Sequence, residues 1–349
     1  MSASKRVKGL WWAFLFAAVL AAAWTIASFG TLLHYRHVSS QGHEYLDLVE
    51  PDEIVDLHQT DATVADLRRA ISDFTSVRSL SLRGNPGVSD DAMAVVARLT
   101  NLVGLNIREC RVSDSGIEHL AALQHLERLY VSGNPITDAC TPTIAAIDSL
   151  RVLHVDRTGI SNEGLREVAK LSDLRDLSVA HTAVTDNGMK AISSAGTLFA
   201  LDASWTDVSD AGIEAVTQHQ RLKRLSLEGT SVSDRGAARI GTVRSLESIN
   251  LGHTSVGDNG ASHLATLPHL YYLGLRNTRV TNRLLPIVAS NPSLRHMDVT
   301  ETQIDREGAL WLKQQRPDID LDLGQGTDES PEGVPLGGGR ALRGHEPGA

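Results

Sequence analysis

The chain repeats itself every 24 residues, and this period constrains its fold more than any other feature. A leucine recurs at this spacing from Leu102 to Leu294, without an insertion or a deletion. A second apolar residue follows three positions later and a third two positions after that, as in Leu105 and Ile107. Apolar residues that alternate with polar ones predict a short strand with one buried face. Repetition at a fixed period of this length indicates an array of stacked units.

Each repeat also contains a turn signal and a helix start. The residue three positions after the strand is threonine in seven consecutive repeats, from Thr158 to Thr302. Further on, most repeats carry Ser or Thr followed by Asp or Asn, as in Thr185-Asp186. Such a hydroxyl residue is typical of a helix N-cap, and an acidic residue is favourable at the positive end of a helix. Leu165 and Val168 then show helical spacing, so we expect a short helix after each strand.

This pattern, written L-x-x-L-x-L-x-x-T/N-x-V-T-D-x-G, resembles the leucine-rich repeat family in its short-helix, ribonuclease-inhibitor-like form. The resemblance covers residues 77–317, as one repeat of 25 residues and nine of 24. It implies an α/β fold: a right-handed β-α solenoid with a parallel sheet on its concave face and short helices outside. Stacking of neighbours supplies the stability, because no unit buries its own apolar face. We expect about ten or eleven strands, each ~4.8 Å from the next.

Several positions depart from the pattern. Cys140 and Leu284 replace the usual glycine, and Asp305 and Arg306, like Asn282, break the cap motif. Threonine is shorter than the asparagine found in many members of the family, so we expect fewer turn hydrogen bonds. Cys110 and Cys140 occupy different phases of adjacent repeats, which favours two small buried side chains over a disulfide.

The composition divides the chain into four segments. They are a cytoplasmic N-terminus with a transmembrane helix (1–36), a juxtamembrane linker (37–51), the leucine-rich repeat domain (52–323) and a disordered tail rich in Gly and Pro (324–349). The repeat domain comprises a degenerate first repeat (52–76), ten repeats (77–317) and a terminal strand (318–323). The tail lacks periodicity and cannot bury enough apolar surface to offset the entropy of ordering.

The N-terminal segment is long and apolar enough to cross a bilayer. Residues 9–33 carry no charge, and a helix of that length spans the ~30 Å hydrocarbon core. Lys5, Arg6 and Lys8 precede it, which predicts a cytoplasmic N-terminus and a repeat domain on the periplasmic or extracellular side of the cell membrane. The alternative is secretion after cleavage near Ala23, where small residues offer a signal-peptidase site.

Composition and motifs exclude several classes of function. The net charge is -9, with 33 Lys+Arg against 42 Asp+Glu, so we expect no nucleic-acid partner. The sequence contains no P-loop, no H-E-x-x-H and no G-x-S-x-G motif, and we therefore expect no enzyme, no cofactor and no metal site. His154 and Asp156 share a strand face and are candidates for a hydrogen bond, but no positioned nucleophile accompanies them.

Strand residues between the buried leucines are expected to point into the concavity, where relatives of this fold bind partners. Trp205 is predicted to be exposed there beside Arg157, His181 and Asp202, a composition typical of an interface hot spot. The alternative is an isolated exposed aromatic. Tyr272 and Arg276 form a second candidate cluster. The complete set of candidate partner-binding residues is Tyr130, His154, Asp156, Arg157, His181, Asp202, Trp205, His253, Tyr272 and Arg276.

Three classes of function remain. The first is a membrane-anchored repeat protein that binds a protein or peptide partner through its concave face outside the cytoplasm, with residues 9–33 in the membrane. The second is a structural envelope or spacer protein without a specific ligand, and the third is an enzyme with unrecognised chemistry. The sequence favours the first. The absence of N-x-[ST] acceptor sites and of cysteine-rich caps favours a bacterial-type envelope protein, but a fold alone does not identify a ligand.

Overall fold

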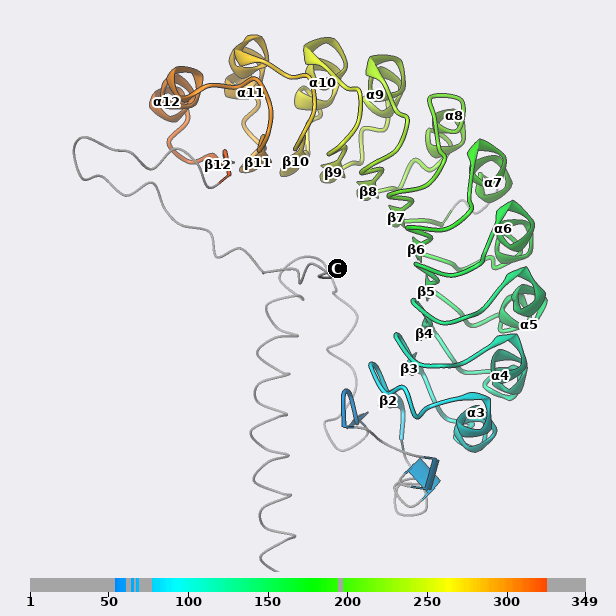
Figure 1. The fold of residues 1–349 in the computed structure, drawn as a ribbon. Coiled ribbons are helices and arrows are strands. Elements are labelled where there is room, and N and C mark those ends of the chain that lie inside the picture. Colours follow the sequence, from blue (N-terminus) through cyan, green and yellow to red (C-terminus); the bar gives the residue numbers. More distant parts are fainter. Residues whose placement is uncertain (1–53, 61–63, 66, 69–76, 194–196, 325–349) are drawn as a thin grey trace, which may run out of the picture. The chain divides into compact units, whose positions relative to one another are not determined.

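The structure, a computed structural model, describes residues 54–60, 64–65, 67–68, 77–193 and 197–324. Contacts divide the chain into two compact units, 1–54 and 55–349, and almost all described residues belong to the second. These residues form one parallel sheet of twelve strands whose spatial order follows the sequence. The helices cover the outer face of this sheet and leave its inner face open (Figure 1).

Each repeat contributes one strand and one short helical segment. The strands are β1 (Ile54–Asp56), β2 (Ser79–Ser81), β3 (Gly104–Asn106), β4 (Arg128–Tyr130), β5 (Val152–His154), β6 (Asp176–Ser178), β7 (Ala200–Asp202), β8 (Arg224–Ser226), β9 (Ser248–Asn250), β10 (Tyr272–Gly274), β11 (His296–Asp298) and β12 (Asp320–Asp322). The α-helices are α3 (Asp90–Val96), α4 (Asp114–Glu118), α5 (Thr141–Ala145), α6 (Asn162–Val168), α7 (Asp186–Ile192), α8 (Ile213–Val216), α9 (Asp234–Ile240), α10 (Asp258–Ala265), α11 (Leu285–Ser290) and α12 (Arg306–Gln315). Three 3₁₀ segments accompany them: η2 (His119–Ala122), η3 (Asp138–Cys140) and η4 (Asn282–Leu284).

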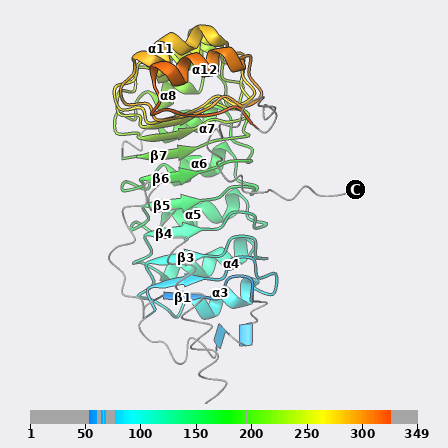
Figure 2. The same cartoon turned by 90° about the vertical axis from the view of Figure 1, so that its left-hand side faces the viewer.

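The 24-residue period keeps all repeats in register. Leu105, Leu129 and Leu153 are direct partners on β3, β4 and β5. Parallel strands require a crossover connection, and the helical segment of each repeat provides it. Figure 2 shows the strands and helices stacked in the same order along this unit.

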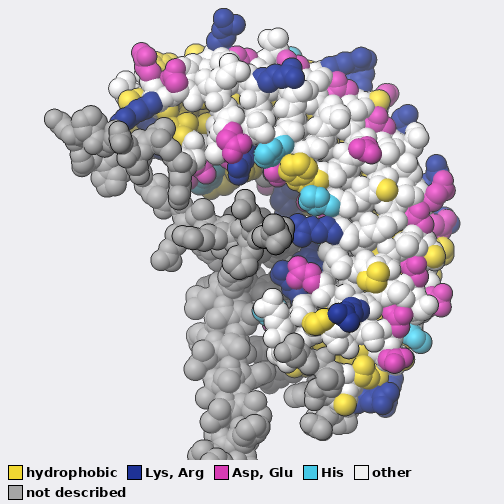
Figure 3. All heavy atoms as spheres, in the orientation of Figure 1, with side chains coloured by type: hydrophobic (Ala, Val, Ile, Leu, Met, Phe, Trp, Pro, Cys, Tyr) yellow, Lys and Arg dark blue, Asp and Glu magenta, His cyan; other side chains and the backbone are white. Residues whose placement is uncertain are grey.

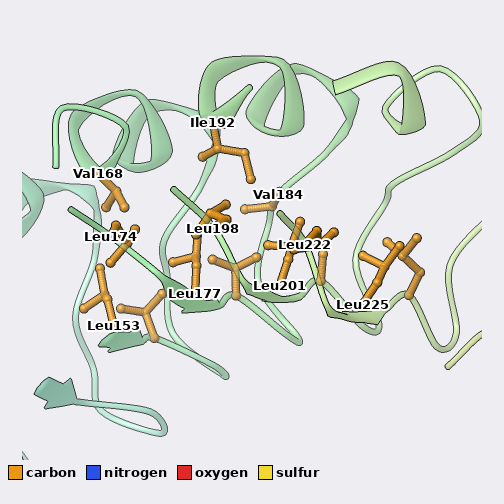
Figure 4. Packing of buried hydrophobic residues seen from close by; sticks show 14 of the residues in the cluster. Leu153, Val168, Leu174, Leu177, Val184, Ile192, Leu198, Leu201, Leu222 and Leu225 are labelled. Carbon is orange, nitrogen blue, oxygen red and sulfur yellow. The ribbon is translucent and has the colours of Figure 1, made fainter. Parts of the chain in front are cut away.

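The core lies between the sheet and the helices. Figure 4 shows strand leucines such as Leu177 and Leu201 close to Ile192 of α7 and to Leu198, which precedes β7. These four side chains are at most 2% exposed. Burying one leucine contributes roughly 1.5–3 kcal/mol, so the repeated leucines hold the stack together.

The sheet has one more strand than the upper limit that we expected. The degenerate first repeat forms β1, and Val55 and Leu57 pack against the core while remaining partly exposed. At the other end, Leu321 of β12 pairs with Met297 of β11. Both end segments keep enough of the apolar alternation to extend the sheet.

The turn hydrogen bonds differ between asparagine and threonine, as expected. The Asn134 side-chain amide donates to the carbonyl oxygens of Ile107 at 2.7 Å and Val131 at 2.9 Å, and so joins two repeats. The Thr158 hydroxyl donates only within its own repeat, to the carbonyl oxygen of Val155 at 2.6 Å. The threonine repeats therefore lack this link between neighbours.

A carboxylate ladder also links neighbouring repeats at the helix starts, both where the asparagine link is present and where it is absent. The Asp114 carboxylate accepts hydrogen bonds from the N–H and from the hydroxyl of Thr137 in the next repeat, both at 2.7 Å. The same double contact recurs at Asp90, Asp138, Asp186, Asp210 and Asp258. We expected these acids to act on their own helices; the structure shows that they also bind the cap of the following repeat.

Three of the irregular repeats begin their helices in ways that the pattern did not predict. Asp305 does not break the cap motif, because its carboxylate accepts the N–H of Gly308 at 2.8 Å and so caps α12, which starts at Arg306. Where Cys140 and Leu284 replace glycine, the helix opens with the 3₁₀ segments η3 and η4.

The two cysteines behave as predicted, since Cys110 and Cys140 are free thiols and both are buried. Among the described residues, no helix has the length and apolar character needed to cross a membrane. The predicted span at 9–33, the linker at 37–51 and residues 325–349 of the expected tail lie outside the described residues.

Candidate partner-binding face

The open face of the sheet carries the side chains that alternate with the buried leucines. On β4, Leu129 is fully buried whereas Tyr130 is partly exposed. Figure 3 shows histidine, charged and hydrophobic side chains gathered along the inner side of the arc of repeats. This concave face holds all ten candidate residues.

A row of residues just after the strands has left-handed backbone geometry, and we call it the rim row. Its members are Gln59, Gly84, Glu109, Gly133, Arg157, His181, Trp205, Gly229, His253, Asn277 and Glu301. The φ angle of Trp205 is 56°, and that of Gly229 is 66°. A residue with a side chain pays roughly 1–2 kcal/mol for this conformation, which glycine adopts freely. Large side chains on the rim row are therefore held at a cost to stability, and such strain clusters at functional sites.

Three rings of the rim row, those of His181, Trp205 and His253, form a cluster that we call the ring cluster. The imidazole of His181 stacks on the indole, with centroids 5.7 Å apart and planes at 7°. The imidazole of His253 also lies against the indole, with centroids 5.3 Å apart and planes at 44°. Asn277 fixes His253 through a 2.9 Å contact between its Nδ2 and the imidazole Nδ1. Trp205 is 44% exposed, so this ring cluster presents an ordered aromatic surface to solvent.

A second cluster surrounds Tyr130 on the strands. The Arg108 guanidinium lies 4.6 Å from the centroid of the Tyr130 ring, and its Nη2 contacts Nδ1 of His154. Tyr130 and His154 meet edge to face at 5.0 Å. The other imidazole nitrogen of His154 lies 3.2 Å from Asp176, which also accepts a hydrogen bond from Arg224 at 3.1 Å.

The candidate hydrogen bond between His154 and Asp156 is not formed. Asp156 instead accepts hydrogen bonds from the hydroxyls of Ser132 and Ser178 and from the N–H of Ala180. The reason is that the strand carries His154 toward Asp176 of the next repeat, while Asp156 lies beyond the strand end among small donors.

Asp202 belongs to this polar region of the face. Its carboxylate accepts hydrogen bonds from the N–H and the hydroxyl of Ser204, at 2.9 and 2.5 Å. Burial raises the pKa of Asp202; the bonds from Ser204 oppose this shift, and the charge of Asp156 adds to it. We expected Asp202 beside Trp205, but the described contacts of the indole are to histidine rings.

Tyr272 and Arg276, the second candidate cluster, share acidic surroundings, because the charges of Asp298 and Glu228 contribute to the raised pKa of both side chains. Arg276 donates to the Glu301 carboxylate at 2.6 Å, on the rim row of the next repeat. Burial, together with the charges of Asp298, Glu228 and Asp322, raises the pKa of Tyr272 to about 12. Arg157 lies exposed on the rim row. Arg108, Asp176 and Arg224 were not among the predicted site residues, although the alternation of the strands places them on the outward-facing side.

The arrangement suits recognition better than catalysis. The histidines of the face contact aromatic rings, an amide, an arginine or a carboxylate. Over the described residues, no group of three His, Cys, Asp or Glu side chains has the geometry of a metal site. The face offers aromatic surface, several guanidinium groups and many hydroxyls at fixed positions. Such a surface can hold an extended polar chain.

Comparison with known proteins gives a consistent result. A family model described as leucine-rich repeat region matches residues 57–311. Among solved structures, an internalin from Listeria monocytogenes is similar over 78% of this chain and 90% of its own, with a TM-score of 0.50 and 16% sequence identity. This likeness concerns the fold alone. No curated protein matches the chain.

Proposed function

This chain belongs to the leucine-rich repeat family, and on that premise we propose that its concave face binds a protein or peptide partner outside the cytoplasm. Residues 9–33 hold the repeat domain at the cell membrane in this proposal, with the N-terminus cytoplasmic. The basic residues before that segment and its uncharged length support this topology. We propose no catalytic reaction for this protein.

The ring cluster is the observation that carries the proposal. An exposed tryptophan adds nothing to the core, and its left-handed backbone costs stability that glycine at the same position would not. Nevertheless, His181, Trp205 and His253 are ordered against one another. Preorganised aromatic side chains lose little entropy on binding and dominate many interfaces. Binding of a partner would bury this exposed ring cluster and so offset the backbone strain at Trp205.

The experiment is recovery of partners by the purified full-length chain, in detergent, from an envelope extract. The test variant is Trp205→Ala, and the matched control is Trp311→Ala. Trp311 is 38% exposed and lies on α12, away from the concave face. We expect Trp205→Ala to fold and to weaken capture by more than about 1 kcal/mol, the range of hot-spot residues, while the control retains capture.

Two results would refute the proposal. Equal recovery by the wild type and Trp205→Ala would remove the ring cluster from the interface. Recovery of no specific partner by the wild type would favour a structural envelope role without a ligand.

The membrane topology has its own test. Protease added to spheroplasts should cleave the repeats, and full protection of the repeats would reverse the proposed orientation.

A further inference from the structure

Arg128 is a buried cation on the concave face, at the start of β4. Only 9% of the residue is exposed, and its Nη2 atom has no hydrogen-bond partner. Over the described part of the chain, none of the ion pairs involves Arg128. Arg224, at the same position four repeats later, pairs with Asp176 at 3.1 Å. Arg128 is thus a buried guanidinium that forms no ion pair with any residue the structure describes.

The fold itself does not require a cation at this position. The partners of Arg128 in the neighbouring repeats are Gly104 and Val152, and Ala200 stands there three repeats later. Burying a charge without a partner costs free energy, because lost hydration is not replaced. An anionic group that arrives from outside would supply the missing interaction.

The surroundings of Arg128 form a notch lined by donors. Ser79, Gly104 and Arg128 are direct partners on β2, β3 and β4. A Cβ atom on Gly104 would lie 3.4 Å from both Nε and Nη2 of Arg128 and 3.2 Å from the Ser79 hydroxyl oxygen. The missing side chain therefore lets the guanidinium and the hydroxyl approach the same point from opposite sides.

Asn106 and Arg108 follow Gly104 on the same face at alternate positions, and we define the arginine notch as Ser79, Gly104, Asn106, Arg108 and Arg128. The Asn106 side-chain oxygen accepts the N–H of Arg108 at 3.2 Å, which orients its amide NH₂ as a further donor. Arg108 lies on the Tyr130 ring and adds positive charge. No member of the notch carries a negative charge, whereas the carboxylates of Asp176 and Asp202 lie further along the sheet, on β6 and β7.

We propose that the arginine notch binds a carboxylate of an acidic segment in the partner, with the Arg128 guanidinium as its counter-charge. This inference rests on the proposed function and specifies the chemistry of the partner. A guanidinium matches the planar fork of a carboxylate through two parallel hydrogen bonds. Tyr130 and His154 hold the Arg108 guanidinium, so Arg128 provides the fork for the carboxylate and Arg108 adds positive charge to this part of the face.

The test measures the binding of fluorescent hexaglutamate, with hexaglutamine as the neutral probe, to the full-length chain in nonionic detergent at low and constant ionic strength. The test variant is Arg128→Met, which keeps an unbranched side chain and removes the charge. The matched control is Arg166→Met, which removes an exposed arginine from α6 on the helical side. Arg128→Lys keeps the charge without the fork. Thermal unfolding of each protein without peptide is the second measurement.

We expect hexaglutamate to bind the wild type and Arg166→Met with equal affinity. Its affinity for Arg128→Met should be at least tenfold lower, and its affinity for Arg128→Lys should be intermediate. Hexaglutamine should bind none of them. The melting temperature of Arg128→Met should equal or exceed that of the wild type, since the variant removes an unpaired buried charge. Equal hexaglutamate binding by Arg128→Met and Arg166→Met, or a loss of folding in Arg128→Met, would overturn the inference. Neither result affects the Trp205→Ala comparison, which tests the proposed function separately.

Discussion

The indole of Trp205 lies over Gly229, the residue that occupies the same rim-row position one repeat later. A Cβ atom on Gly229 would lie 2.5 Å from ring atoms Cδ2 and Cε3 of Trp205. The absence of that atom allows the indole to reach across a whole repeat and to contact His253, two repeats away, at 5.3 Å. A glycine in one repeat thus determines the contacts of an aromatic side chain in another.

Gly229→Ala should displace the Trp205 ring. The new methyl group overlaps the indole, and the φ of 66° adds backbone strain. We expect a loss of stability of about 1–3 kcal/mol, a changed tryptophan fluorescence spectrum and weaker partner capture. Gly133→Ala is the control, because its φ of 72° imposes similar strain while its Cβ would lie 3.5 Å from Glu109, an ordinary contact. Identical behaviour of the two variants would contradict the role given to Gly229.

Trp205→Gly should be more stable than Trp205→Ala. Both variants remove the ring, but only glycine adopts the φ of 56° without strain. We expect a difference of about 1 kcal/mol in the free energy of unfolding, measured with urea, and equally weak partner capture. If alanine proved as stable as glycine, the rim row would not be strained and one argument for a binding role would be lost.

The fold was predictable because the repeat leaves few alternatives. The unbroken spacing from Leu102 to Leu294 places each apolar residue in the same layer of the stack, and twelve strands in sequence order result. Contacts between repeats were not predictable where one side chain acts on two repeats. The Asp114 carboxylate caps the next repeat through Thr137, and a pattern read within one repeat does not show that contact.

The candidate face was predictable as a surface but not as a set of contacts. Alternation identified Tyr130 and Trp205 as outward-facing residues. The partners of these side chains depend on length and rotamer, so Arg108 rather than Asp156 contacts His154. The left-handed geometry of the rim row carried a signal in the sequence, since glycine occupies it at Gly84, Gly133 and Gly229, but bulky residues elsewhere in the row obscured it.

Asp186→Ala should destabilise the stack more than Asp186→Asn does. Asp186 accepts hydrogen bonds from the N–H and from the hydroxyl of Ser209, both at 2.7 Å. Alanine leaves these donors without their acceptor, at a cost of about 1–3 kcal/mol. Asparagine retains an acceptor, as Asn162 shows by accepting the N–H of Thr185 at 2.9 Å. Chemical unfolding of both variants is the measurement, and equal losses would mean that the ladder contributes little.

The ladder should also make stability depend on pH in the acid range. Burial alone would raise the pKa of Asp114, but hydrogen bonds from Thr137 and Cys140 outweigh burial and lower it. A carboxyl with a lowered pKa in the folded state stabilises the protein above its unfolded pKa of about 3.9 and loses that contribution as the pH falls through the folded value. We therefore expect the stability advantage of the wild type over Asp114→Asn to be constant between about pH 5 and 7 and to shrink below about pH 4. Urea unfolding of both proteins across this pH range measures the difference in their free energies of unfolding. An advantage that grew on acidification would show that the Asp114 carboxylate does not stabilise the folded chain through these bonds.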